Sequence, residues 1–223
     1  TYAEVISGYT SFYLGAKSVC PTVTMDVTFT GSWYDEALEK EAANKLIAGG
    51  CKLISQHADS TGAPAACQEA LDAGTTVYCV GYNVDMLAVA PTAALTSPTN
   101  VWEVFYEYAF NAVMNGETFD QNWCQGYEAD AVTLTPLGES CAPGTQEKVD
   151  ETIAAIKDGS LHVFDTSKFT VDGAEVTTAP IDLTYYDFST GSPVAVYQGE
   201  TKEAISDGYF HEGELRAAPT FAL

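Results

Sequence analysis

The sequence predicts an α/β fold built on a doubly wound parallel sheet. Strand-like and helix-like segments alternate along most of the chain, the connections between them are short, and the strand-like segment 76–82 is apolar on both faces. Short connections in a βαβα order place successive strands in one parallel sheet, with helices against it. With 223 residues, of which 46% are hydrophobic, the chain is large enough to bury a substantial core.

The first elements follow from side-chain periodicity. Residues 4–19 place apolar side chains on one helical stripe, and Pro21 ends that helix. Residues 23–30 alternate strictly between apolar and polar side chains, which is typical of a strand. A second helix is predicted from residue 36 to about residue 48, where two glycines stop it.

The same cycle then repeats. We expect strands at 52–56, 76–82, 93–96 and 131–135, and helices at 64–73, 101–115 and 145–158. The strand at 131–135 is expected to continue the parallel sheet. The last sixty residues are rich in Gly, Pro, Thr and Tyr and show no clear period, so we predict extended segments and loops there.

Charge and composition exclude several classes of partner. The chain carries 9 Lys and Arg against 31 Asp and Glu, a net charge of −22. A surface this negative repels nucleic acid and anionic membranes, so no nucleic-acid partner is predicted. No apolar run in the sequence approaches the ~20 residues that a membrane-spanning helix needs.

The cysteines point to an oxidising compartment. None of the six stands in a C-x-x-C pair, which argues against zinc ribbons and thioredoxin-like chemistry. One or two disulfides fit this number better than six free thiols, and at least one disulfide is expected. The sequence does not choose among the possible pairings of Cys20, Cys51, Cys67, Cys79, Cys124 and Cys141.

The predicted ligand site lies at the carboxyl ends of the strands, where ligands bind in open parallel sheets. This rule gathers the loops Gly31–Asp35, His57–Ser60, Tyr82–Asp85 and Thr96–Pro98. The candidate ligand-binding residues are Trp33, Tyr34, His57, Asp59, Ser60, Tyr82, Asn83 and Asp85. Aromatic rings can sandwich a flat or sugar-like ligand, while carboxylates and amides accept hydrogen bonds from hydroxyl and amine groups. The set favours a nucleoside or a sugar over a phosphate or a lipid.

Several of these residues also have structural explanations. Asp35, and Asp59 or Ser60, stand just before predicted helices, where Asp and Ser are ordinary N-caps. The two aromatic rings of the first loop could plug the end of the sheet, and a lone histidine such as His57 is more often a structural hydrogen-bonder. Asp85 follows a strand with no obvious helix to cap, which makes it the leading ligand candidate.

Catalytic signatures are missing from the sequence. It contains no G-x-S-x-G, Walker, G-x-G-x-x-G or H-E-x-x-H motif, and its three histidines are few for a metal centre. We therefore predict a binding protein without enzymatic activity, cofactor or metal. Two alternatives stay open: a ligand-sensing domain on the same fold, and a nucleoside-hydrolysing enzyme that uses Asp59 and Asp85.

The motifs GSWYD (31–35), QHADS (56–60) and GYNVD (81–85), in this order, give the sequence a resemblance to a known family. With EVISGYTSFYLGAKS (4–18) and LTSPTNVWEVFYEYAFNAVMNG (95–116), the chain resembles the basic membrane protein (BMP, PnrA-like) family of ABC-transporter solute-binding lipoproteins. The resemblance implies a type I periplasmic-binding-protein-like fold, in which doubly wound parallel sheets form two αβα lobes around a ligand cleft.

The resemblance also implies a function and roles for the site residues. It implies a purine nucleoside or nucleobase as ligand, an ABC permease as partner, and a periplasmic or extracellular location with a lipidated N-terminal anchor that is absent from this chain. Trp33 or Tyr34 would stack on the base, His57 or Asp59 would line its edge, and Asn83 or Asp85 would hold the ribose hydroxyls.

Family members carry a whole first lobe before the segment that matches Glu4, so the first lobe is expected to be incomplete here. The implied domains are the second lobe (1–97), an excursion into the first lobe (98–130), and a return crossing with a helix and a C-terminal extension (131–223). A missing N-terminal lobe segment is the expected partner of helix 101–115. Without it, the stripe Val101, Val104, Phe105 and Tyr108 should form a bare apolar patch.

Overall fold

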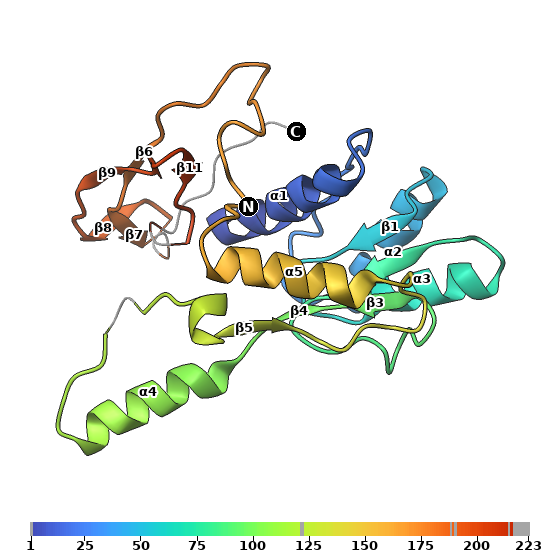
Figure 1. Ribbon diagram of the computed structural model, residues 1–223, viewed down its shortest axis with the longest axis horizontal. Coiled ribbons are helices and arrows are strands. Elements are labelled where there is room, and N and C mark those ends of the chain that lie inside the picture. Colours follow the sequence, from blue (N-terminus) through green and yellow to red (C-terminus); the bar gives the residue numbers. More distant parts are fainter. Residues whose placement is uncertain (1, 121–122, 188, 190, 214, 216–223) are drawn as a thin grey trace. The chain divides into compact units, whose positions relative to one another are not determined.

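The computed structural model describes residues 2–120, 123–187, 189, 191–213 and 215 (Figure 1). The chain divides into two compact units. One consists of Thr1–Met25 with His162–Leu223, and the other of Asp26–Leu161. The boundaries predicted at residues 97 and 130 from the resemblance stay a prediction. None of the helices in the described part of the chain has both the length and the apolarity to cross a membrane.

A parallel sheet forms the centre of the Asp26–Leu161 unit. Strands β1 (Leu53–Ser55), β2 (Tyr78–Val80) and β3 (Ala94–Thr96) pair in the order β1-β2-β3, with all neighbours parallel. Cys79 lies opposite Ile54, and both side chains are buried. The predicted α/β class with a parallel sheet is confirmed.

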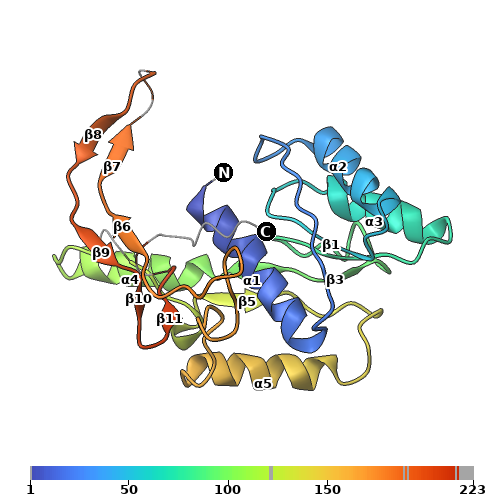
Figure 2. The same cartoon turned by 90° about the horizontal axis from the view of Figure 1, so that it is seen from above.

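Helices α2 (Glu36–Ala48) and α3 (Gly62–Asp72) pack against each other beside this sheet (Figure 2). Their backbones come very close at Gly62, where an added Cβ would lie 2.3 Å from the carbonyl oxygen of Glu36. Only glycine permits this approach. The core between helices and sheet is built mainly from small side chains: Ala43, Ile54, Ala63, Ala66, Cys67, Val77, Cys79, Met86, Ala90, Ala93 and Ala94.

The next strands depart from the predicted topology. β4 (Pro98–Asn100) and β5 (Val132–Leu134) pair with each other antiparallel, so the strand at 131–135 does not extend the parallel sheet as expected. The chain leaves β4 through α4 (Trp102–Met114), returns through the short helix η1 (Tyr127–Ala129), and then runs back along β4. Helix α5 (Thr145–Lys157) follows, close to its predicted range.

The strand predicted at 23–30 is wrong. This segment is irregular and pairs with no strand in the part of the chain that the structure describes. Val27 and Phe29, which belong to its apolar positions, are 37% and 57% exposed. Alternation of side chains supplies two different faces, but a strand also needs a hydrogen-bonding neighbour.

The other unit contains α1 (Ala3–Val19) and short antiparallel pairs. The predicted helix 4–19 is confirmed, although Val19 at its end is 72% exposed rather than on a packed stripe. The pairs are β6 (Pro180–Asp182) with β9 (Thr201–Glu203), β7 (Tyr185–Asp187) with β8 (Val194–Tyr197), and β10 (Ile205–Ser206) with β11 (Tyr209–Phe210). Phe164, Ala204 and Phe210 form the small core of this unit.

All six cysteines are thiols in this structure, so the expected disulfide is not formed in it. Cys67 and Cys79 are buried, Cys51 and Cys141 are partly buried, and the remaining two are exposed.

Candidate ligand-binding site

The loops that follow β1 and β2 meet at one edge of the sheet. The ring of His57 stacks on the ring of Tyr82, with centroids 4.3 Å apart and planes inclined by 27°. The side-chain amide of Asn83 donates a hydrogen bond of 3.0 Å to the carboxylate of Asp59. Neighbouring parallel strands end at the same edge, which is why residues more than twenty positions apart come together.

The loop before α2 joins them through the backbone. The amide nitrogen of Asp59 donates a hydrogen bond of 2.8 Å to the carbonyl oxygen of Trp33. The side chains of Trp33 and Tyr34 are 44% and 65% exposed, so neither plugs the end of the sheet. Both rings are accessible to a ligand.

Asp35 is the N-cap of α2. Its carboxylate accepts a hydrogen bond of 3.0 Å from the amide of Leu38, and the Glu39 carboxylate accepts one of 3.1 Å from the amide of Asp35. Together these bonds hold backbone amides on both sides of the helix start. One oxygen of the buried Glu39 carboxylate has no hydrogen-bond partner among the residues that the structure describes.

Ser60 is fully buried within its loop. Its hydroxyl accepts a hydrogen bond of 3.1 Å from the amide of Gly62, at the start of α3. The Gln56 amide donates to the carbonyl oxygens of Ala58 and Ser60, at 2.7 and 2.9 Å. These bonds fix the shape of the loop that carries His57 and Asp59, and a ligand role for Ser60 stays a prediction.

Asp85 has a backbone partner of its own. Its carboxylate accepts a hydrogen bond of 2.8 Å from the amide of Leu87, and its side chain is exposed. Asp85 therefore stabilises the start of the turn that follows it. It has this structural role although the sequence showed no helix there for it to cap. One carboxylate oxygen is not used by this bond.

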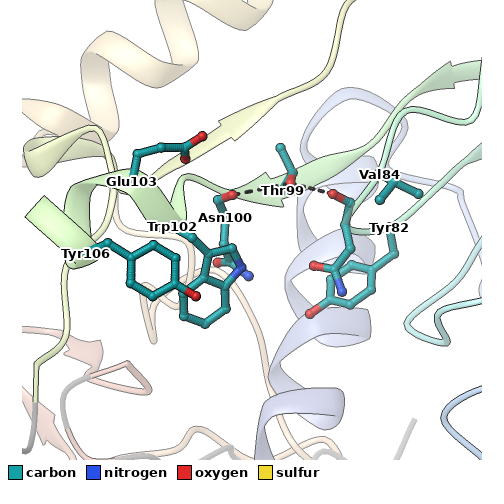
Figure 3. A pocket seen from close by; sticks show the side chains of 8 residues that line it. Tyr82, Val84, Thr99, Asn100, Trp102, Glu103 and Tyr106 are labelled. Atoms are coloured by element: carbon teal, nitrogen blue, oxygen red, sulfur yellow. Dashed lines mark hydrogen bonds between the residues drawn. The ribbon is translucent and has the colours of Figure 1, made fainter.

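An open pocket of about 730 Å³ lies beside these loops (Figure 3). It is lined by Tyr82, Asn83, Val84, Thr99, Asn100, Trp102, Glu103 and Tyr106. Figure 3 shows the rings of Trp102 and Tyr106 together on one side and the ring of Tyr82 on the other. The centroids of the first two rings are 6.3 Å apart.

The backbone on the Tyr82 side of the pocket is closely fixed. Asn83 has a φ of 63°, in the left-handed region that asparagine tolerates better than most residues. Its amide nitrogen donates to the carbonyl oxygen of Pro98 at 2.9 Å, and its carbonyl oxygen accepts from the Thr99 hydroxyl. At Gly81, an added Cβ would lie 2.4 Å from both Met86 Cγ and Ser97 Oγ.

The structure divides the eight predicted site residues into groups. Tyr82 and Asn83 line the pocket, and His57 and Asp59 contact those two side chains directly. Trp33 is tied to Asp59 by its backbone. The others, Tyr34, Ser60 and Asp85, do not line the pocket.

Sequence reasoning missed the second side of the pocket. Asn100, Trp102, Glu103 and Tyr106 belong to the end of β4 and the first turns of α4, which the periodicity presented only as an amphipathic helix. The sequence did contain one signal for them. These residues come directly after a strand, as the residues of GYNVD do, and could have been named as site candidates on that ground. In the described part of the chain, no three His, Cys, Asp or Glu side chains gather as metal ligands.

The lining chemistry suits a flat ligand with hydrogen-bond donors. Three aromatic rings offer stacking surfaces, two amides both donate and accept, and the Glu103 carboxylate accepts. No lysine or arginine lines the pocket, so it offers no positive side chain to a phosphate.

Two solved solute-binding proteins share this fold. An ABC transporter solute-binding protein from Conexibacter woesei superposes with a TM-score of 0.56 at 21% identity, covering 72% of this chain and 53% of that one. A solute-binding protein from Aeropyrum pernix gives the same TM-score at 19% identity, with coverages of 70% and 52%. The fold is therefore that of ABC-transporter solute-binding proteins.

The sequence comparison gives the family. The family of PnrA-like ABC transporter substrate-binding proteins matches residues 1–158, and the chain belongs to it. A purine-binding protein of Brucella abortus is 36% identical over 172 residues, or 77% of this chain and 47% of that protein. A putative ABC transporter glucose-binding protein of Haloferax volcanii is 33% identical over 164 residues, or 71% and 38%. The chain thus spans less than half the length of these two relatives. The resemblance seen in the sequence is confirmed, and the family is one of extracytoplasmic solute-binding proteins.

Proposed function

We propose that this chain binds a purine nucleoside or nucleobase for an ABC importer and catalyses no reaction. The observation that carries the proposal is the pocket lined by the rings of Tyr82, Trp102 and Tyr106, by the amides of Asn83 and Asn100, and by the Glu103 side chain. Figure 3 shows Tyr82 on one side and the other two rings on the opposite side. The similarity to a purine-binding protein supports the choice of ligand.

Each side of the pocket has a role in this proposal. The purine ring stacks on the aromatic side chains, because every base offers a flat face of π electrons. The amides of Asn83 and Asn100 supply donors and acceptors to the polar edge of the base. Glu103 accepts hydrogen bonds from ribose hydroxyls or from an exocyclic amine.

The remaining predicted residues surround this centre. His57 supports the ring of Tyr82, and Asp59 holds the amide of Asn83, so both act by positioning the pocket side chains. Trp33 and Tyr34 form an exposed aromatic flank from which a second stacking contact could come. Asp85 would reach a ligand hydroxyl with the carboxylate oxygen that its turn does not use.

The rest of the first lobe would complete the site in the whole protein. The pocket is open, and relatives that match this chain are more than twice as long as the matched part. We infer that an N-terminal lobe segment supplies the opposite wall, as a ligand held on one side keeps only part of its buried surface. A lipid anchor and a permease partner belong to the same proposal.

Helix α4 is the surface on which that segment would pack. Its expected bare stripe is partly covered, because Phe105 and Tyr108 contact the ring of Trp123 at centroid distances of 5.2 and 6.4 Å. The exposed face is instead the row Trp102, Tyr106 and Phe110, at 58%, 50% and 66% exposure. An aromatic row of this kind is typical of an interaction surface.

Isothermal titration calorimetry tests the ligand. We expect purine nucleosides or bases to bind, and ribose or glucose to bind at least tenfold more weakly, because the sugars lack the stacking ring. Trp102→Ala should weaken purine binding by roughly ten- to hundredfold. Phe110→Ala is the matched control, since Phe110 is in the same aromatic row but does not line the pocket.

Preference for a free sugar would overturn the purine assignment. It would favour glucose, the sugar in the name of the Haloferax volcanii relative. Release of free base from a nucleoside during incubation would instead support a hydrolase.

A further inference from the structure

Another open pocket, of about 490 Å³, lies in the unit formed by Thr1–Met25 with His162–Leu223. It is lined by Lys17, Thr166, Ser167, Lys168, Phe169, Thr170, Glu175, Val176 and Thr177. All but the first of these residues come after residue 158, where the match to the family ends. The pocket shares no residue with the one proposed for the purine.

A tight turn fixes the loop that supplies most of this pocket. Val171 and Ala174 exchange two backbone hydrogen bonds of 2.9 Å. Between them, Asp172 and Gly173 both have a positive φ, 51° and 75°. Positive φ at both central residues is typical of a type I′ hairpin turn, which Asp-Gly favours. The lining residues before the turn and those after it therefore lie on neighbouring arms of one hairpin.

Helix α1 brings Lys17 to the same pocket. Leu14, three residues earlier and on the same side of this helix, packs against the small core of the unit. Phe169, which is next to Lys168, packs against the same core. Because the neighbours of both lysines are anchored in one core, the two ammonium-bearing side chains reach one pocket.

The charges in the pocket wall are only partly balanced. The Lys168 ammonium forms an ion pair of 3.1 Å with the Asp165 carboxylate, so its charge is matched within its own loop. Lys17 Nζ instead donates to the hydroxyl of Tyr13 at 3.2 Å and lies 5.3 Å from the centroid of that ring. None of the ion pairs in the part of the chain that the structure describes includes Lys17 or Glu175. The wall thus presents one unmatched positive charge and one unmatched negative charge.

Two opposite charges that line one pocket without pairing can each pair with a ligand. A simple anion would match only Lys17, and a simple cation would match only Glu175. A ligand that carries both a carboxylate and an ammonium group matches both, through charge-assisted hydrogen bonds. The hydroxyls of Thr170 and Thr177 add further donors and acceptors. We propose that this pocket binds a small zwitterion of the amino-acid class, with its carboxylate on Lys17 and its ammonium group on Glu175.

An NMR titration of the isotope-labelled chain with glycine tests the proposal. Glycine is the smallest molecule with both groups, acetate lacks its amine, and methylamine lacks its carboxylate. We expect glycine to shift the backbone amide signals of Lys17 and of residues 166–177. Glycine should bind roughly three- to tenfold more tightly than acetate or methylamine, because each of these loses one charged contact at an exposed site. Acetate binding as tightly as glycine would overturn the proposal in favour of a plain anion site, and so would signals at these residues that glycine leaves unshifted.

Two variants separate the two charges. Lys17→Gln should weaken glycine binding by roughly three- to tenfold. Lys45→Gln is the matched control, because Lys45 also lies in the last turn of a helix but belongs to the other unit. Glu175→Gln should weaken glycine binding by a similar factor and leave acetate binding unchanged or tighter, since it removes a repulsive carboxylate.

Circular dichroism checks that the variants are folded, which is expected because both side chains are exposed. Unchanged glycine affinity in either pocket variant, or an equal loss in Lys45→Gln, would overturn the assignment of the charges. The comparison of glycine, acetate and methylamine uses the unmodified chain, so it decides the ligand class even where a variant does not fold. Neither test depends on whether the chain binds a purine.

Discussion

The side-chain amide of Asn83 donates to the carboxylate of Asp59 at 3.0 Å, across the ends of two neighbouring strands. The backbone of Asn83 is in the left-handed region, with a φ of 63°, and is held there by bonds to Pro98 and Thr99. One residue thus connects β1, β2 and β4 at the edge of the pocket. Its side chain and its backbone can be tested separately.

Asn83→Gly should leave the fold intact and weaken ligand binding by roughly tenfold, since glycine accepts the positive φ but lacks the amide. Calorimetry and circular dichroism measure the two effects. Asp207→Gly is a matched control, because Asp207 also has a positive φ of 51° but lies in the other unit. Unchanged affinity in the Asn83 variant would remove this amide from the site.

Trp33→Ala should weaken binding without unfolding the protein, because Trp33 is an exposed ring on the loop that is bonded to Asp59. A stacking contact of this kind corresponds to roughly ten- to hundredfold in affinity. Tyr197→Ala, which removes another exposed ring in the other unit, should bind like the unmodified protein. Equal affinities for both variants would place Trp33 outside the site.

Asp85 requires two variants, because its carboxylate already accepts from the amide of Leu87. Asp85→Asn keeps an oxygen for that bond and removes the charge, whereas Asp85→Ala removes both. A direct ligand role predicts a loss of roughly ten- to hundredfold in affinity for both variants. If only the alanine variant weakens binding, calorimetry assigns Asp85 to the turn alone.

Gly81→Ala should lower the free energy of unfolding by ~1–3 kcal/mol, because the new methyl group would overlap with Met86 and Ser97. Gly15→Ala in α1 should have the opposite sign, stabilising by about 0.5–1 kcal/mol, since nothing lies within 4 Å of its Cβ position. Urea denaturation compares the two. A neutral Gly81 variant would show that the loop relaxes easily.

Asp165 should contribute an acid-sensitive part of the stability of its unit. Hydrogen bonds from the side chain and backbone of Ser167, with the nearby Lys168 ammonium, lower the pKa of this carboxyl from 3.8 to about 2. A carboxyl whose pKa is lower in the folded protein than in the unfolded chain stabilises the fold at pH values above its unfolded pKa. This contribution is lost as the pH falls through the folded-state pKa, here between about 4 and about 2. Thermal unfolding of Asp165→Asn should lack this component, whereas Asp172→Asn should retain it.

The elements that the sequence predicted well are those with local signals. Helix 36–48 has a capping residue, an apolar stripe and a glycine stop, and all three act within a few residues of one another. The failed strand at 23–30 had only alternation, which says nothing about a neighbour. The antiparallel pairing of β4 with β5 depends on how the chain returns from α4, more than twenty residues later.

The candidate site divides in the same way. His57, Asp59, Tyr82 and Asn83 could be predicted together, because the rule for parallel sheets joins the ends of neighbouring strands. Trp102 and Glu103 could not, since their positions depend on β4 leaving the sheet at Pro98. The structural role of Ser60 inside its loop is recognised from the burial of the residue, and a polar loop sequence does not reveal that burial.

The exposure of Trp102 allows ligand binding in the pocket to be followed by tryptophan fluorescence. Its indole is 58% exposed and lines the pocket, so in the free protein it emits from a largely aqueous environment. A ring stacked on it would exclude water and shift the emission to the blue, or quench it. The chain has three tryptophans, and only Trp102 lines this pocket in the described structure, so Trp102→Phe isolates its signal. The protein thus has a built-in fluorophore for following ligand arrival in real time, without a label.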